Sequence, residues 1–320
     1  MSEDPPPPVS DASTVRARDS RPEPGLHLVS TPIGAARDIT LRGLDILRGA
    51  DVLAAEDTRS LRRLLEIHGI ALAGRPLLAY HDHNGPSVRP RLLAALAGGK
   101  SVAYAPEAGT PLVADPGYQL VRAAVAAGHR VLAAPGPSAA LAALAVSGLP
   151  SDRFLFAGFP PPQRTARRRW AEELRAVPAT LILFESPRRI RDLLGVLCET
   201  WGAEREAALC RELTKRFEEV RRGSLGQLAA SLAGSGLRGE VVLVVDRARG
   251  AGVETAEGAA QDLATDLRLQ MRNLSRKDAV ARVAAERGLP RRQVYQAALA
   301  LDAGEAEGGA ADEGAANGTD

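Results

Sequence analysis

Three short turns, each following an apolar run of the chain, combine glycine with proline and small residues. The turns hold Pro32 and Gly34, then Ala108, Gly109, Thr110 and Pro111, and finally Pro135, Gly136, Pro137 and Ser138. Glycine lets the backbone turn tightly, so that its amide and carbonyl groups approach a ligand closely. Because the turns contain no lysine and no serine-rich phosphate cradle, the sequence predicts a nucleoside as the ligand rather than a phosphate.

Two later junctions carry charged side chains directly after apolar runs. Glu185 ends one run and is followed by Arg188 and Arg189. The second junction is the stretch Glu212, Leu213, Thr214 and Lys215. A solvated charge run is one interpretation of this stretch. The chain has only three lysines, however, and one of them beside a threonine after an apolar run favours a functional role.

A basic segment at 163–170 interleaves arginines with an aromatic residue, since Arg164, Arg167, Arg168 and Arg169 precede Trp170. One interpretation is a solvated helix face. The other is RNA binding, because arginines contact phosphates while an aromatic ring stacks on a base.

Two other stretches resemble a nucleotide-hydrolysis motif and a metal site, but neither pattern is complete. The stretch 97–101, AGGKS, resembles half of a Walker A motif, but Ala94 replaces its first glycine and the segment joins a helix to a strand. The stretch 80–84, YHDHN, places two histidines and an aspartate together, and we favour a polar loop over a metal site. The two cysteines have no metal-ligand spacing.

Short apolar runs alternate with helical patterns along most of the chain, as at 26–31 and 51–56 with the helix that starts after Thr40. This alternation predicts an α/β fold with a parallel or mixed sheet covered by helices. The three turns would then meet at the carboxyl edge of the sheet, where ligands bind. A second unit of the same kind follows at 154–246.

We divide the chain into six segments: a disordered tail at 1–24, an α/β domain with the cofactor-binding turns at 25–138, a second α/β domain at 139–247, a linker at 248–262, a helical extension at 263–301 and a disordered acidic tail at 302–320. The extension holds two short helices broken at 288–290. Its basic residues are Arg276, Lys277, Arg291 and Arg292. It either caps the C-terminus or contacts nucleic acid.

Charge is unevenly distributed. The chain carries +2 overall, but the two tails carry −2 and −6, so that residues 25–301 carry +10. A body this basic suits a polyanionic partner. No apolar run approaches the ~20 residues needed to span a membrane, and no signal peptide is visible. We therefore expect a cytoplasmic protein.

Taken together and in order, five stretches resemble the ribosomal RNA small subunit methyltransferase I family of the tetrapyrrole (corrin/porphyrin) methylase superfamily. They are STPIGAARDITLRGLDILRGADVLAAEDTR, EAGTPLVADPGYQLVRAA, APGPSAALAALAVSGLPSDRFLFAGF, FESPRR and RELTKRFEEVRRG. The resemblance runs from Leu26 to Asp246, and the C-terminal helical pair is similar to the family's tail.

The resemblance implies a two-domain tetrapyrrole-methylase-like fold with the cofactor cleft between the domains, and a homodimer. It implies 2′-O-methylation of the ribose of cytidine-1402 in 16S rRNA of the small ribosomal subunit, with S-adenosylmethionine as the methyl donor. The three turns, with Glu212, Leu213 and Thr214, would bind the cofactor. The arginines of 163–170, with Arg188 and Arg189, would contact RNA.

A ribose hydroxyl must lose its proton as it attacks, so a general base or an electrostatic stabiliser is expected. The candidates are Glu185, Glu107 and Lys215, and less favourably His81 or His83. The chain departs from the family pattern at three places. Pro106-Glu107 replaces the usual Ser-Asp, Ala35 replaces an asparagine and Arg188 replaces a histidine.

Two alternative functions follow from these observations. One is methylation of a tetrapyrrole, since the superfamily's fold serves both reactions. The other is a catalytically silent RNA-binding or ribosome-assembly protein that keeps the cofactor only as a structural ligand.

Overall fold

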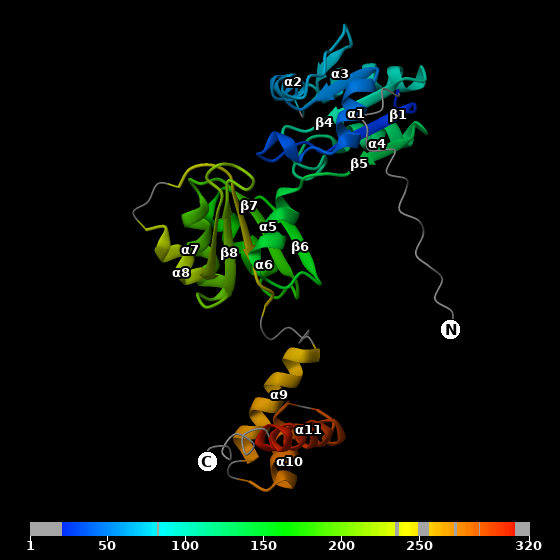
Figure 1. Cartoon of the computed structure of the whole chain (residues 1–320). Coiled ribbons are helices and arrows are strands. Elements are labelled where there is room, and N and C mark those ends of the chain that lie inside the picture. The colour runs from blue at the N-terminus through cyan, green and yellow to red at the C-terminus, as the bar shows by residue number, and fades with distance from the viewer. Residues whose placement is uncertain are drawn as a thin grey trace, which may run out of the picture. The chain divides into compact units, whose positions relative to one another are not determined.

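The computed structural model describes residues 21–81, 83–233, 237–248, 256–271, 274–287 and 289–310. The chain falls into two compact units that divide between Arg249 and Gly250. The first unit holds two sheets with their helices, and the second holds three helices (Figure 1). Residues 1–20 and 311–320 of the predicted tails, and 249–255 of the predicted linker, lie outside the described residues.

The first α/β domain contains a five-stranded parallel sheet in the order β3-β2-β4-β1-β5. Its elements are β1 (Gly25–Val29), the 3-10 turn η2 (Ala36–Asp38), α1 (Leu41–Gly49), β2 (Val52–Ala55), α2 (Thr58–Ile67), β3 (Leu77–Ala79), α3 (Gly85–Ala97), β4 (Ser101–Ala105), α4 (Tyr118–Ala126) and β5 (Val131–Ala134). Strands β2 and β4 are buried along their whole length, which is typical of a parallel sheet with helices on both faces.

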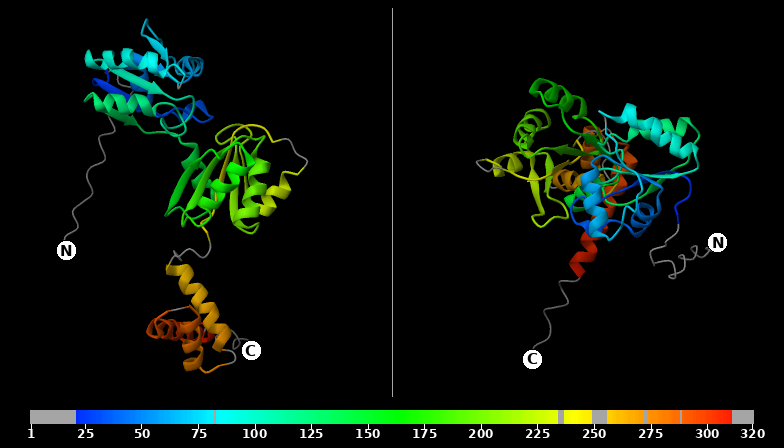
Figure 2. Two further views of the ribbon diagram at one scale, coloured as in Figure 1. Left: turned by 180° about the vertical axis from the view of Figure 1, so that it is seen from behind. Right: turned by 90° about the horizontal axis from the view of Figure 1, so that it is seen from above.

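Alternate side chains of these strands enter two separate cores. Val29 and Leu53 pack with α1 and α2, whereas Leu26 and Val52 pack with α3 and α4 on the opposite face (Figures 1 and 2). Helix α1 begins at the predicted residue, because the Thr40 hydroxyl accepts a hydrogen bond from the amide of Gly43.

The second α/β domain contains a mixed sheet in the order β6-β7-β10-β8-β9. Its elements are α5 (Ala139–Ser147), β6 (Phe154–Gly158), α6 (Arg164–Leu174), β7 (Thr180–Glu185), α7 (Ile190–Trp201), β8 (Glu206–Arg211), β9 (Glu219–Ser224), α8 (Leu225–Ser231) and β10 (Val241–Val245). Strand β10 is antiparallel to both β7 and β8, and β8 and β9 form a hairpin. The predicted two-domain α/β fold is confirmed.

One face of the second sheet is covered by α6, α7 and α8. The other face packs on α5, and here Ile33 of the first domain joins Ile182, Leu213 and Val244 in one apolar cluster. The loop after β1 is therefore part of the core of the second domain.

The second unit consists of α9 (Ala256–Met271), α10 (Arg276–Arg287) and α11 (Arg291–Ala310). Helix α9 begins inside the predicted linker, because Leu263 and Leu267 lie one turn apart and are buried against α10 and α11. Helices α10 and α11 are separated where the break was predicted. Among the described residues, no helix is long and apolar enough to cross a membrane.

Candidate active site

The three glycine- and proline-containing turns lie side by side, because they follow the adjacent strands β4, β1 and β5. Thr31 and Gly109 exchange both backbone hydrogen bonds, with N–O distances of 2.9 and 3.0 Å. The Thr110 hydroxyl donates to the carbonyl of Pro137 at 2.9 Å. The first turn is thus tied to the second and the second to the third, at the edge where the sequence placed them.

Glycine is required at two of these positions. Gly109 has a φ of +82°, which side chains rarely adopt. At Gly136, a Cβ atom would lie 2.9 Å from the Cβ of Ser30. The two glycines therefore allow the turns to pack against one another.

Strained backbone follows the second turn. Leu112 and Ala114 have φ values of +70° and +61°, a conformation that costs free energy for residues other than glycine. The Asp115 carboxylate holds this segment by accepting from the amide of Leu112 at 2.7 Å and from the Tyr104 hydroxyl at 3.0 Å. Strain of this kind clusters at functional sites.

The opposite wall carries a second strained turn, in which Glu212 and Thr214 have φ values of +51° and +62°. Lys215 Nζ donates to the carboxylates of Glu212 at 3.0 Å and Glu240 at 3.1 Å. The Thr214 hydroxyl accepts from the amide of Ala35 at 3.0 Å. This turn therefore joins the two domains.

The ionisation of this cluster follows from its contacts. Burial acts to lower the pKa of Lys215, but the hydrogen bonds to Glu212 and Glu240 outweigh it and the pKa lies above its usual value. The amide of Glu240, and then Lys215, lower the pKa of the Glu212 carboxyl. Lys215 is thus protonated at neutral pH, which favours an electrostatic role over that of a general base.

Glu185 lies at the end of β7 with a fully buried side chain. Its Oε1 accepts from the amide of Ser186 at 2.6 Å and from Nε of Arg189 at 2.8 Å. Its Oε2 is buried and has no hydrogen-bond partner among the described residues. A buried carboxylate oxygen normally has one, so Oε2 is the acceptor of this carboxylate whose hydrogen-bonding capacity is left over.

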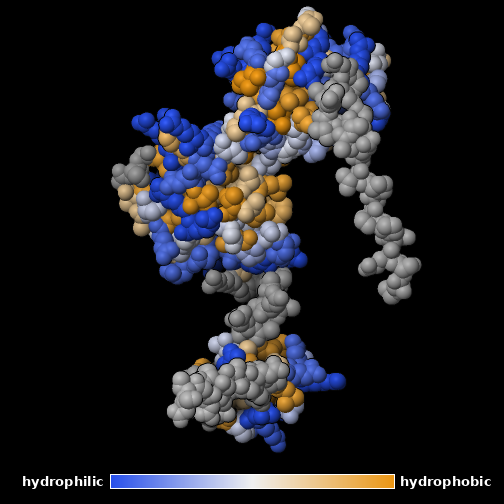
Figure 3. All heavy atoms as spheres, in the orientation of Figure 1, coloured by the Kyte–Doolittle hydropathy of each residue, from blue (hydrophilic) through white to orange (hydrophobic). Residues whose placement is uncertain are grey.

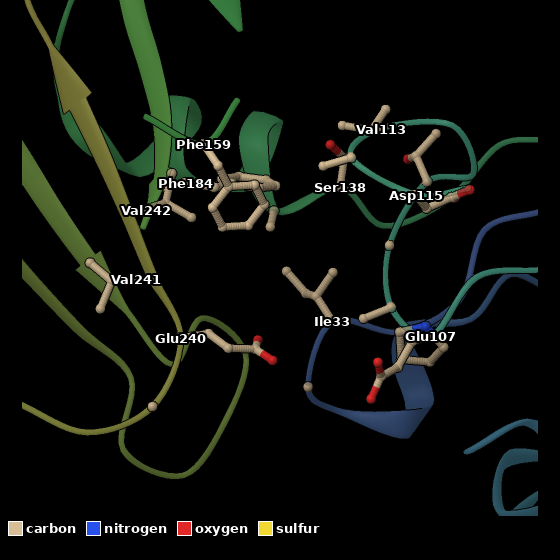
Figure 4. A pocket seen from close by; sticks show the side chains of 18 of the residues that line it. Ile33, Glu107, Val113, Asp115, Ser138, Phe159, Phe184, Glu240, Val241 and Val242 are labelled. Atoms are coloured by element: carbon tan, nitrogen blue, oxygen red, sulfur yellow. The ribbon is translucent and has the colours of Figure 1, made fainter. Parts of the chain in front are cut away.

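These features surround one cleft with a cavity volume of about 650 Å³. In Figure 4, Phe159, Phe184, Val242 and Glu240 lie on one wall, Val113, Asp115, Ser138 and Glu107 lie on the other, and Ile33 lies between them. The predicted site residues that line the cleft are Pro32, Gly34, Glu107, Ala108, Gly109, Thr110, Ser138, Glu185 and Lys215.

The other predicted cofactor residues do not belong to the lining of the cleft. Leu213 is buried in the core shared with Ile33, and Glu212 and Thr214 make the contacts described above. The remaining members of this group, which belong to the second and third turns, are Pro111, Pro135, Gly136 and Pro137.

The predicted RNA-binding arginines fall into two groups. Three of them are exposed on α6 and pair with acidic residues: Arg164 with Glu199, Arg168 with Glu172 and Arg169 with Glu173. These pairs favour the interpretation as a solvated helix face. Arg188 is exposed next to Pro187, which lines the cleft.

One member of the set needs correction. Arg167 is 3% exposed and donates to the carbonyls of Pro161 and Pro162, so its guanidinium is not available to a phosphate. Arg189 pairs with Glu185, but its side chain is 34% exposed, and its contact with RNA stays a prediction.

Sequence reasoning missed several lining residues, chiefly Ile33, Asp115, Phe159, Phe184 and Glu240. Asp115 lies in an Asp-Pro-Gly stretch, which could have indicated a structured turn. The aromatic residues gave no signal, because a phenylalanine after an apolar run is also typical of a core.

The cleft fits a cationic nucleoside. Among the described residues that line it, the acidic ones are Glu56, Glu107, Asp115, Glu185 and Glu240, and the basic one is Lys215. An acidic lining attracts a sulfonium and an ammonium group and repels phosphates, while the apolar side chains can cover an adenine ring. S-Adenosylmethionine has these groups. The described residues bring together no set of three or more histidine, cysteine or acidic side chains suited to a metal ion.

Comparison with known proteins defines the class. The family model for tetrapyrrole (corrin/porphyrin) methylases matches residues 25–229. A solved cobalt precorrin-4 methyltransferase shares the fold with a TM-score of 0.54 at 18% identity, covering 69% of this chain and 94% of that one. The chain therefore belongs to the tetrapyrrole methylases and has their fold.

Within this class, the chain belongs to the ribosomal RNA small subunit methyltransferase I family, which confirms the resemblance. The relative from Mesorhizobium japonicum is 54% identical over 73% of this chain and 79% of its own length. The relative from Escherichia coli O157:H7 is 40% identical over 86% and 94%. A model described as the RsmI C-terminal HTH domain matches residues 257–302.

Replacing Lys215 with methionine leaves Glu212 and Glu240 without their shared cation, and we expect the free energy of unfolding at pH 7 to fall by about 2 kcal/mol. The stability that ionised Glu212 provides is present above its unfolded pKa of about 4.3 and is lost as pH falls through its lowered folded pKa. The contribution of Lys215 is present below about 10.4 and is lost as pH rises through its raised folded pKa.

The difference in the free energy of unfolding between wild type and Lys215→Met should therefore be largest between these two pH values and smaller outside them. Urea unfolding at a series of pH values measures this difference. The exposed Lys100→Met is the control and should change stability by less than about 0.5 kcal/mol. A difference that is constant with pH would contradict the assigned ion pairs.

Proposed function

We propose that this chain transfers the methyl group of S-adenosylmethionine to the 2′ oxygen of the ribose of cytidine-1402 in 16S rRNA. Membership of the family makes the chain an S-adenosylmethionine-dependent rRNA methyltransferase. The observation that carries the proposal is the cleft, with nucleoside-type turns on one wall and a buried carboxylate with an unpartnered oxygen on the other. Relatives at 39–54% identity are named as rRNA methyltransferases, whereas tetrapyrrole enzymes share only the fold.

The chemistry requires positioning and removal of one proton. S-Adenosylmethionine, when bound, supplies a methyl group already activated on a sulfonium, so alignment of the acceptor oxygen provides much of the rate. We assign the proton of the attacking hydroxyl to Glu185 Oε2, because Arg189 and Ser186 occupy only Oε1. Glu107 lines the same cleft but is exposed, and Lys215 supplies positive charge.

Homodimer formation is part of this proposal. Strands β5 and β6 are unpaired edges of their sheets, and Phe154, Leu155 and Leu141 nearby are 45%, 37% and 54% exposed. Figure 3 shows hydrophobic side chains gathered over α5 and β6. Exposed apolar surface beside an open strand edge is typical of an interface. We place the enzyme in the cytoplasm, with its ribosomal substrate.

The helical unit would then contribute to RNA binding. Arg291, Arg292 and Tyr295 are exposed in the first turns of α11, beside the buried Val294 and Ala298. The affinity for small subunits should fall with salt, and a plot of log affinity against log salt concentration gives a slope. We expect the double variant Arg291→Gln/Arg292→Gln to make this slope less steep by about 2. Filter binding at several salt concentrations measures this slope.

The exposed Arg91 on α3 provides the control for that experiment, since Arg91→Gln should leave the slope unchanged. An unchanged slope for the double variant, together with lower thermal stability, would favour the interpretation of the unit as a structural cap.

The experiment that tests the proposed function is transfer of labelled methyl from S-adenosylmethionine to small subunits that lack the modification, followed by mapping of the labelled nucleotide. Label on the ribose of cytidine-1402 is the expected result. Cofactor binding without label would support the catalytically silent alternative. Absence of cofactor-dependent thermal stabilisation, which should reach about 2.7 kcal/mol at a hundredfold excess over Kd, would contradict both.

A further inference from the structure

Phe159 is a large aromatic side chain that lines the cleft and is nevertheless 55% exposed. Its ring contacts that of Phe184 edge-to-face, with centroids 5.6 Å apart at 71°. Phe184 in turn contacts Phe156 at 4.8 Å and 68°. The ring of Phe159 is thus held on one side and open on the other.

The backbone directs this ring to the cleft. Pairing between β6 and β7 shifts register between Phe156 and Gly158, and Gly158 has a φ of +69°. Strand side chains alternate between faces, so without the shift Phe159 would lie on the face of Ala157, which packs against α6 and α7. The extra residue moves it to the face of Phe184. Bulges next to sites commonly re-aim a side chain in this way.

We propose that Phe159 is the platform on which the base of the target nucleotide stacks while its ribose lies in the cleft. This inference rests on the proposed function. A ribose hydroxyl can enter the cleft only if its nucleotide leaves the RNA stack, and the base then loses its stacking partners. An open aromatic face restores stacking, as in proteins that bind unpaired nucleotides.

The open position of the ring favours the substrate base over the adenine of the cofactor. The buried apolar lining of the cleft is provided by Ile33 and Val242 at 7% and 6% exposure, which suits a group enclosed between the domains. Phe159 lies at the accessible part of the lining. Its ring is therefore open to RNA that approaches from solvent.

The test compares Phe159→Ala, Phe159→Leu and Phe159→Trp by kcat/KM for small subunits and by Kd for S-adenosylmethionine. We expect Phe159→Ala to lower kcat/KM by about 10- to 100-fold, since stacking of one base is worth about this factor, with the cofactor Kd unchanged within twofold. Phe159→Trp should retain most activity. Phe159→Leu, which keeps volume but not the flat ring, should lose activity substantially.

Phe217 supplies the matched control, because it is a 65% exposed phenylalanine on the same domain that does not line the cleft. Phe217→Ala should keep wild-type kcat/KM, and thermal unfolding verifies that all variants fold. Equal activity of Phe159→Ala and Phe217→Ala would overturn the inference, as would a wild-type rate for Phe159→Leu.

A rise in cofactor Kd with an unchanged KM for subunits would assign the ring to the adenine instead. These results can be distinguished from a failure of the proposed function. If the proposed function were wrong, the wild-type enzyme itself would place no label on the ribose.

Discussion

Glu185→Gln lowers kcat for methyl transfer to small subunits by about 10²- to 10⁴-fold, the range that general-base catalysis provides, while the Kd for S-adenosylmethionine stays within a few-fold of wild type. Glutamine has the same shape as glutamate and can keep its carbonyl oxygen toward Arg189 and the amide of Ser186. Its amide group cannot accept the proton of the ribose hydroxyl. Single-turnover kinetics at saturating cofactor measures the chemical step directly.

The comparison with Glu107→Gln decides which carboxylate takes the proton. Glu107 lines the same cleft from the opposite domain, but it is exposed, and its own amide donates to Glu56 at 3.0 Å. We expect Glu107→Gln to cost less than about tenfold in kcat. If Glu107→Gln caused the large loss and Glu185→Gln the small one, the assignment would be reversed. If both retained wild-type kcat, no carboxylate of this pair would act as the base.

The parts of the site that lie on regular strand ends could be predicted from sequence. The three turns and Glu185 each follow a short apolar run, and the carboxyl ends of parallel strands share one edge of a sheet. The meeting of the three turns therefore follows from the topology of the first sheet, whereas Glu185 ends a strand of the second sheet. The sequence also identified Thr40 as a helix start, because a threonine before a helical pattern is a local signal.

Features that depend on tertiary contacts could not be predicted in this way. Arg167 looked like an RNA contact, but whether an arginine faces solvent, a carbonyl or a buried carboxylate depends on neighbours distant in the fold. The orientation of Phe159 depends on a register shift between β6 and β7, which no local pattern announces. Helix α9 was hidden because its alanine- and glycine-rich start resembles a linker.

Gly34→Ala adds a methyl group to the cleft lining at the point where the two domains meet, and it should disrupt their contact. The added Cβ would lie 2.6 Å from the Thr214 hydroxyl and from Cγ of Lys215, and 2.8 Å from the carbonyl oxygen of Leu213. A flexible side chain could move away, but a backbone oxygen can move only with its turn. Overpacking of this kind costs about 1–3 kcal/mol.

The displaced turn carries Thr214, whose bond to Ala35 joins the domains, and Lys215, which lines the cleft. We therefore expect Gly34→Ala to raise the Kd for S-adenosylmethionine by more than about tenfold, in addition to lowering the melting temperature. Gly195→Ala in α7 is the matched control, because a Cβ there meets nothing within 4 Å. Alanine in a helix interior should stabilise the protein by about 0.5–1 kcal/mol.

Isothermal titration with S-adenosylmethionine and thermal unfolding of both variants test this contrast. Opposite signs of the stability change, with cofactor binding lost only in Gly34→Ala, would follow from the steric cause. Tight cofactor binding by Gly34→Ala would mean that the Leu213–Lys215 turn can move without altering the cleft. The loop after β1 would then position the turn without being required for the cofactor site.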